Sequence, residues 1–225
     1  MAQFFRWILA LGFGWLALLS GCVRTPDYVD RLPLPPVSRV QASASLAAAQ
    51  RVLEQRCVVC HGCYDAPCQL KLDSYAGLAR GGSEQRVYDG ARLAAVTPTR
   101  LDIDAHDVAS WRERGFHAVL PEGDSRREPR ESVLLRMLDL KRANPLPEVQ
   151  DLRKDFTFDI DRKQSCTDSK HFDSYANAHP LWGMPYGLPA LSDEEWTAVN
   201  NWVQKGAPYI EPPELSRVIK HSIEQ

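Results

Sequence analysis

The sequence lacks both an excess of one charge and an apolar run long enough to cross a membrane. Its 27 Lys and Arg residues nearly balance 29 Asp and Glu, giving a formal net charge of −2. Nucleic-acid binders typically carry a clustered positive excess, so we expect no nucleic-acid partner. The longest uncharged apolar run, residues 7–19, falls short of the roughly 20 residues of a spanning helix. A hydrophobic share of 44% still indicates a folded protein rather than a disordered one.

The N-terminal segment has the pattern of an export signal. Arg6 precedes the apolar run, which ends in Leu-Ser-Gly-Cys at residues 19–22. This ending resembles a bacterial lipobox, which predicts a signal peptide over 1–21 and lipidation of Cys22. An ordinary secretory signal is the alternative. Since Val23 rather than Asp follows, we expect a periplasmic protein anchored by lipid to the outer membrane.

The remaining chain predicts a tether followed by a helical domain. Four prolines between residues 22 and 42 indicate an extended linker. Helix-forming residues over 42–56 place Leu46, Leu53, Cys57 and Cys60 on one stripe. The domain is expected over 43–211, with a long irregular insertion at about 70–180. A further helix-like pattern over 212–225 has no stop signal and is interpreted as the start of a truncated helix.

Two later segments also carry helix signals. Residues 132–138 continue a short amphipathic helix that Asn144 and Pro145 stop. Ser192 and Glu195 form a capping box, which predicts a helix that begins after Ser192. Gly206 is placed to end that helix in a left-handed cap. The prediction is therefore an all-α chain.

The functional signal is the pair Cys57 and Cys60 with His61 directly after it. Two residues between cysteines put both thiols on one edge of a helical turn, where they can add to the two vinyl groups of a haem. The adjacent His61 imidazole would then ligate the iron. We therefore predict one covalent haem c, which requires the cytochrome c maturation machinery as a partner.

Three other interpretations compete for this cluster. With Cys63 and Cys68, the spacing approaches an iron–sulfur ligand run, but the last interval is one residue too long and Gln69 stands where proline is expected. A structural zinc site would use a second ligand pair at a distance. A purely structural disulfide pair leaves His61 unexplained.

Three cysteines remain once Cys22 carries lipid and the CxxCH pair carries haem. A disulfide between Cys63 and Cys68, with Cys166 left free, is the favoured pairing because a short loop can close. A Cys63–Cys166 pairing is the alternative.

Met184 is the candidate sixth ligand of the iron, since it lies in a Pro- and Gly-rich loop before the terminal helix. Met137 falls on a helix stripe and is expected in the core. The other histidines have no helical pairing and are expected to be structural or on the surface; they are His106, His117, His171, His179 and His221. Among them, His171 and His179 are kept as reserve distal ligands because they approach Met184 in sequence.

Two resemblances follow from these motifs. A helix into CxxCH, a Met-Pro loop at 184–185 and a capped terminal helix resemble class I cytochromes c, which implies a cytochrome c-like haem domain. RCVVCHGCYDAPCQLK at 56–71, ARGG at 79–82, TRLDIDA at 99–105 and WRERGF at 111–116 closely resemble the bacterial fatty acid cis/trans isomerases, periplasmic c-type haem proteins. This second resemblance runs from about Arg51 to Glu211.

The isomerase resemblance implies a function. Cys57 and Cys60 would hold the haem, and His61 would be its proximal iron ligand. Met184, which the cytochrome c resemblance supplies, would be a labile sixth ligand, and His61 and Met184 are the expected catalytic residues. The reaction would convert cis double bonds of membrane-derived unsaturated fatty acids to trans, which reduces membrane fluidity under stress. Ferric haem would withdraw electron density from the alkene so that the bond can rotate. The alternatives are a lipid-anchored electron-transfer cytochrome c with a redox partner, and a haem-based sensing module.

Overall fold

The computed structural model describes residues 39–63, 66–85, 98–122, 128–146 and 166–209, with side chains from residue 42 onward. The expected signal peptide, the lipidation site Cys22, most of the tether and the segment 212–225 lie outside the described residues. All the described residues fall in one compact unit.

The described residues are helical. The elements are α2 (Arg39–Arg56), α3 (Val58–His61), η2 (Pro67–Gln69), α4 (Tyr75–Arg80), α5 (Val108–Glu113), η4 (Pro129–Glu131), α6 (Val133–Ala143), α7 (Phe172–Ala178) and α8 (Asp193–Gln204). Within this part of the chain the only β pairing is two isolated bridges, so the all-α prediction is confirmed. None of the described helices is both long and apolar enough to cross a bilayer.

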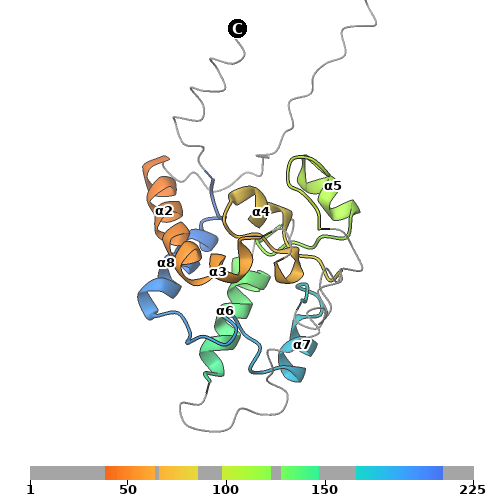
Figure 1. Cartoon of the computed structure of the whole chain (residues 1–225). Coiled ribbons are helices and arrows are strands. Elements are labelled where there is room, and N and C mark those ends of the chain that lie inside the picture. The colour runs from red at the N-terminus through yellow and green to blue at the C-terminus, as the bar shows by residue number, and fades with distance from the viewer. Residues whose placement is uncertain (1–38, 64–65, 86–97, 123–127, 147–165, 210–225) are drawn as a thin grey trace, which may run out of the picture. The chain divides into compact units, whose positions relative to one another are not determined.

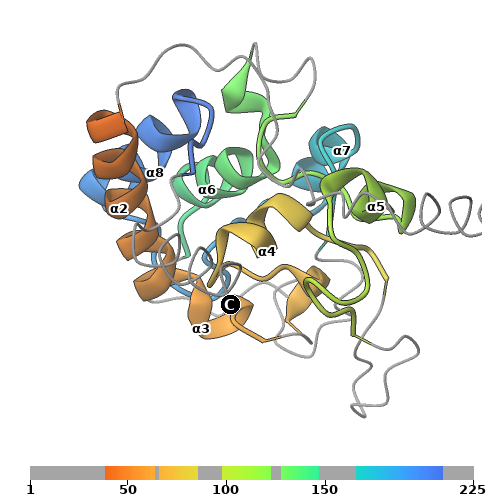
Figure 2. The ribbon, with the colours of Figure 1, turned by 90° about the horizontal axis from the view of Figure 1, so that it is seen from above.

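The first and last described helices pack side by side, as Figures 1 and 2 show. Ala49 and Leu53 of α2 and Val199 and Val203 of α8 belong to one buried apolar cluster. At the end of α2, the Arg56 guanidinium lies 3.2 Å from the Glu195 carboxylate at the start of α8. This packing places the residues that follow α2 beside the loop that precedes α8.

The predicted signals of α8 are confirmed. The Ser192 side chain accepts from the Glu195 N–H, and the Glu195 carboxylate accepts from the Ser192 N–H, so both halves of the capping box are present. Helix α8 ends at Gln204, and Gly206 adopts a positive φ of 84°. Helix α6 starts after Ser132, whose hydroxyl accepts from the Leu135 N–H, and ends before Asn144.

The stretch predicted to be an irregular insertion contains more regular structure than expected. Helices α4, α5, α6 and α7 all lie between residues 70 and 180. Helix α7, in the second half of this stretch, was not predicted from the sequence. Phe172 and Tyr175, three residues apart, bury their rings in the main core, so tertiary packing stabilises a helix whose sequence is polar.

Candidate functional site

The CxxCH residues form one helical turn that continues directly from α2. The Cys57 N–H donates to the Leu53 carbonyl at 2.9 Å, and the His61 N–H donates to the Cys57 carbonyl at 2.9 Å. Both Cys57 and Cys60 are free thiols. Burial raises the pKa of Cys57 to about 11, partly opposed by the neighbouring Arg56 cation, so this thiol is protonated at neutral pH.

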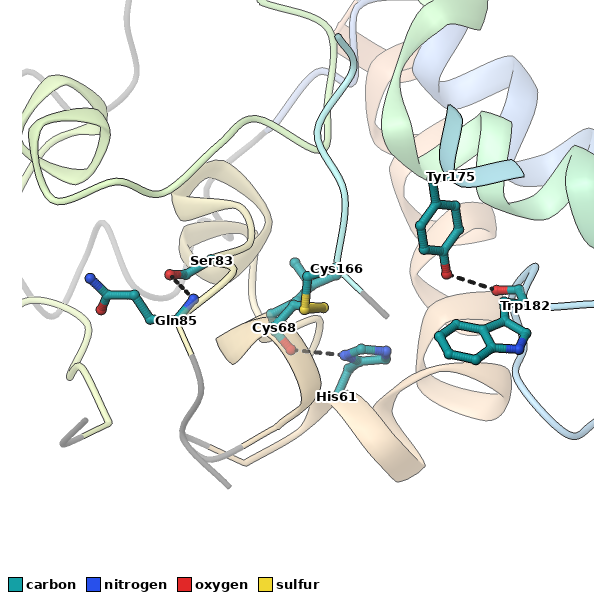
Figure 3. Close-up of a disulfide and its surroundings, with 8 residues drawn as sticks. His61, Cys68, Ser83, Gln85, Cys166, Tyr175 and Trp182 are labelled. Carbon is teal, nitrogen blue, oxygen red and sulfur yellow. Dashed lines mark hydrogen bonds between the residues drawn. A yellow bond between two sulfur atoms is a disulfide. The ribbon is translucent and has the colours of Figure 1, made fainter. Parts of the chain in front are cut away.

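His61 is buried and held in one orientation. Only 7% of the residue is exposed, and its Nδ1 lies 3.1 Å from the Leu70 carbonyl oxygen (Figure 3). Because a carbonyl can only accept, Nδ1 carries the proton, which in a neutral ring leaves the lone pair on Nε2. The Leu72 N–H in turn donates to the His61 carbonyl at 2.7 Å. A backbone carbonyl that accepts from one ring nitrogen is the usual support of a histidine that ligates a metal through the other.

A cavity of about 230 Å³ connects the predicted site residues. It is lined by all four residues that are predicted to hold a haem: Cys57, Cys60, His61 and Met184. Most of the other lining side chains are apolar: Pro67, Leu70, Leu72, Val119, Val133, Leu134, Met137, Leu138, Pro185 and Leu188. The structure therefore brings the predicted haem residues to a single, mainly apolar cavity.

Two reserve ligands do not line this cavity. His171 is exposed, and its Nδ1 pairs with the Asp168 carboxylate at 2.8 Å. The His179 ring stacks on Trp182 with the ring centroids 4.1 Å apart. In the described part of the chain, the imidazole rings that line the cavity therefore belong to other histidines.

The Met184 loop is fixed on helix α6. The Met184 N–H donates to the Met137 carbonyl at 3.0 Å, and Gly183 lies so close that an added Cβ would be 2.2 Å from the Lys141 backbone nitrogen. Met137 is buried in the core, as predicted, and also lines the cavity. The α6 face and the Met184 loop thus form one continuous wall with two thioethers.

The predicted disulfide is wrong in its partner. Cys68 pairs with Cys166 (Figure 3), at a Cα–Cα distance of 5.5 Å. Cys63 is an exposed free thiol. Neither the favoured Cys63–Cys68 pairing nor the alternative Cys63–Cys166 pairing is present. The reason is that folding brings together two residues 98 positions apart, which spacing along the chain does not reveal. With Cys68 in a disulfide, the four thiolates of an iron–sulfur site are not available either.

His117 is a cavity residue that the sequence analysis placed among the structural or surface histidines. Its backbone forms an antiparallel bridge with Gly82, through two hydrogen bonds of 2.8 and 3.0 Å. Its Nε2 would lie 3.1 Å from a Cβ added to Gly82, so the glycine makes room for the ring. Burial lowers the pKa of His117 although the Asp168 and Glu84 carboxylates act in the opposite direction. The sequence signal that could have singled out this histidine is its position directly after the WRERGF motif.

The three quoted motifs outside the cysteine cluster meet around Arg80. The Arg80 side chain donates to the Gln69 carbonyl and to Thr99, and its guanidinium lies over the Trp111 and Phe116 rings. Arg112 donates to the Arg80 carbonyl at 2.7 Å. These contacts hold residues 80–82 against residues 116–117. The three motifs therefore support the part of the cavity wall that contains His117 and do not themselves supply its reactive groups.

Comparison with known proteins decides the family. A family model described as fatty acid cis/trans isomerase (CTI) matches residues 96–225, more than half of the chain. The chain belongs to the fatty acid cis/trans isomerase family. No curated protein and no solved structure matches it. The matched region of this isomerase family member contains His117, Cys166 and Met184 but begins after CxxCH, so the family match and the haem motif are independent observations.

Proposed function

We propose that this chain carries one covalent haem and uses it in the cis-to-trans isomerisation of double bonds in membrane-derived unsaturated fatty acids. The observation that carries the proposal is that Cys57, Cys60, His61 and Met184 line one cavity in a member of the isomerase family. The family match supports the reaction, and the cavity supports the cofactor.

The residues at the cavity fit a haem. Two free thiols stand on one turn, the adjacent imidazole has its lone pair on Nε2, and the walls beyond them are apolar. Cys57 and Cys60 would form the thioether bonds, and His61 would hold the iron. When bound, the haem supplies an electron-accepting iron that can draw electron density from an alkene and weaken its π bond.

The apolar wall of α6 would bind the acyl chain and exclude water from it. Leu134, Met137 and Leu138 present one face of the helix to the cavity, with Val119 beside them. Such a surface suits a hydrocarbon chain, because burying each CH₂ contributes about 0.8 kcal/mol. The side chains thereby hold the double bond in a dry environment, where small shifts in electron density have large effects.

Met184 would be the sixth ligand and would have to bind weakly. A stable His and Met pair is typical of electron-transfer haems, whereas an alkene needs access to the iron. The Met184 side chain is only partly buried, although its backbone is fixed on α6. In the loaded protein, we expect added imidazole to displace Met184 readily and Met184→Ala to keep its haem but lose the Met–iron absorption band. A Met–iron band that resists added ligand at neutral pH would contradict this assignment.

The cellular setting is part of the proposal. A lipobox ending at Cys22 and a CxxCH motif both suit a periplasmic protein anchored by lipid to the outer membrane, matured by the cytochrome c machinery. Unsaturated fatty acids released from the membrane would then be substrates close at hand. Straight trans chains pack more tightly than bent cis chains, so the reaction would lower membrane fluidity under stress.

Incubation with palmitoleic acid tests the function. The chain is purified from cells that mature c-type haem, and trans product is measured by gas chromatography against a Cys57→Ala, Cys60→Ala control that lacks covalent haem. We expect trans product from the loaded chain only. The second candidate, a lipid-anchored electron carrier, is favoured by His61 and Met184 on the same cavity. Rapid reduction by a partner cytochrome without any trans product would establish the carrier instead.

A further inference from the structure

Arg56 is the one permanently charged residue of the described cavity lining. Among the described residues that line the cavity, no other is Lys, Arg, Asp or Glu. His117 does not add a second cation, because burial lowers its pKa and favours the neutral ring. A few placed polar groups in a mainly apolar cavity fix the orientation of a ligand. A single cation in such a cavity suits an amphiphile with one anionic head group and a hydrocarbon tail.

Arg56 lies where the cavity lining is exposed to solvent. Its side chain is 26% exposed, and Leu188, another lining residue, is 40% exposed. Other apolar lining residues are buried: Leu72, Val119, Met137 and Leu138. The lining therefore changes from a partly solvated cation to a buried hydrocarbon surface. A fatty acid changes in the same way, from its carboxylate to the end of its tail.

Both terminal nitrogens of the Arg56 guanidinium are anchored to the loop and helix that follow Leu188. Nη2 donates to the Pro189 carbonyl at 2.9 Å and to the Ala190 carbonyl at 3.3 Å. Nη1 donates to the two oxygens of the Glu195 carboxylate at 3.3 and 3.2 Å. A side chain that is already ordered loses less conformational entropy when it binds a ligand. The guanidinium is therefore preorganised on the cavity.

Glu195 does not cancel the positive charge of Arg56 inside the cavity. The Glu195 carboxylate is partly exposed and also accepts from the Ser192 N–H at 2.8 Å. At the cavity thiol of Cys57, the Arg56 cation lowers the pKa by more than the Glu195 anion raises it. In addition, no contact with a described residue uses the Arg56 Nε–H, one of the five donors of a guanidinium. Arg56 therefore has both the charge and a donor for a second carboxylate.

We propose that Arg56 binds the carboxylate of a free fatty acid and thereby determines head-group specificity and the position of the chain. This inference rests on the proposed function, because it adds a head-group site to the cavity that would hold the acyl chain. An ionised carboxylate forms strong charge-assisted hydrogen bonds with a guanidinium, whereas an ester oxygen carries no charge. An acyl chain still esterified in a phospholipid therefore lacks this contact. The propionates of the proposed haem carry the same chemical group, so the test must distinguish the two carboxylates.

Calorimetric titration of the purified full-length chain with two ligands tests the proposal. Palmitoleic acid and palmitoleyl alcohol share one hydrocarbon chain and differ in the charge of the head group, and both are used below their aggregation limits at mildly alkaline pH. We expect the wild type to bind the acid about tenfold more tightly than the alcohol, as for a charge-assisted contact. In Arg56→Gln the two affinities should become similar, with the alcohol unaffected. Arg51→Gln, at an exposed position of the same helix, should retain the preference for the acid.

A second variant moves the affinity in the opposite direction. Glu195→Gln removes the competing anion and should tighten binding of the acid about two- to threefold without changing that of the alcohol. Equal losses for acid and alcohol in Arg56→Gln, or a wild type that does not prefer the acid, would overturn the proposal. If that wild-type result comes with a changed haem reduction potential in Arg56→Gln, Arg56 binds a haem propionate instead. Binding requires no turnover, so a failure to form trans product is a separate result.

Discussion

The two walls of the cavity are built in opposite ways. The first wall, residues 56–72, is nearly continuous in sequence and is shaped by local bonds, such as those from Cys57 to Leu53 and from His61 to Leu70. The second wall, defined by the lining residues between His117 and Leu188, comes from several segments far apart in the chain. It is assembled by the Gly82 bridge, the α6 face and the Cys166 disulfide.

The two walls also differ in the kind of residue that they contribute to the cavity. The first wall supplies both thiols and the buried imidazole, while the second supplies most of the apolar surface and Met184. The family match covers all of the second wall and none of the first. We therefore expect damage to the first wall to prevent attachment of the proposed haem and spare the fold, and damage to the second wall to weaken the fold.

The largest expected effect is on the first wall. A Cys57→Ala, Cys60→Ala variant should lose all covalent haem, because no thiol remains to bond the vinyl groups. Cys63→Ala, which removes an exposed thiol three residues further on, is the matched control and should keep its haem. Haem staining of a denaturing gel measures both. Staining retained by the double variant would show that the first wall does not attach the cofactor.

The next effect tests the second wall. Gly81 has a φ of 82°, and a Cβ there would lie 2.0 Å from the His117 carbonyl oxygen. With a ψ of −158° as well, Gly81 lies in a backbone region that is essentially limited to glycine, so Gly81→Ala should combine a backbone cost of about 1–3 kcal/mol with about 1–3 kcal/mol of overpacking. Gly115→Ala has a positive-φ cost without the overpacking, because Gly115 has a φ of 84° but no atom within 4 Å of an added Cβ. If both variants lose the same free energy of unfolding, the backbone at His117 must move away from an added Gly81 Cβ at little cost.

The same contrast explains what the sequence could predict. The capping box at Ser192, the helix into CxxCH and the convergence on Met184 depend on spacing over a few residues or on a known motif, and the structure contains them. The pairing of Cys68 with Cys166 and the place of His117 depend on contacts across long separations, which single-sequence patterns do not encode. Helix α7 was missed because its stability comes from burying Phe172 and Tyr175, not from helix propensity.

A smaller effect concerns an unusual cation behind the second wall. Lys141, one turn beyond Met137 on α6, is 1% exposed, and its Nζ has no hydrogen-bond partner among the described residues. Burial lowers its pKa from the ordinary 10.5. The unfolded chain then binds more protons between the lowered value and 10.5, so the free energy of unfolding should rise with pH through that window.

Lys141→Met should remove this pH dependence and stabilise the protein at neutral pH by about 1–3 kcal/mol, because it removes an unpaired buried amine. Lys170→Met, at an exposed turn position, is the control and should change little. Denaturant unfolding at neutral and alkaline pH measures both variants. Destabilisation by Lys141→Met at neutral pH would mean that the amine has a favourable role in the folded protein.

The smallest expected effects lie at the α2–α8 contact, where the first wall meets the loop of the second. Ser192→Ala removes the helix cap and should cost about 1 kcal/mol. Glu195→Gln keeps a side chain that can accept from the Ser192 N–H but loses the charge opposite Arg56, and a partly exposed ion pair contributes only about 0.2–1 kcal/mol. Thermal unfolding at low and high salt distinguishes them, since only the second loss should shrink with added salt. If Glu195→Gln costs more than Ser192→Ala at high salt, the Arg56 contact is a structural link between the walls rather than a surface ion pair.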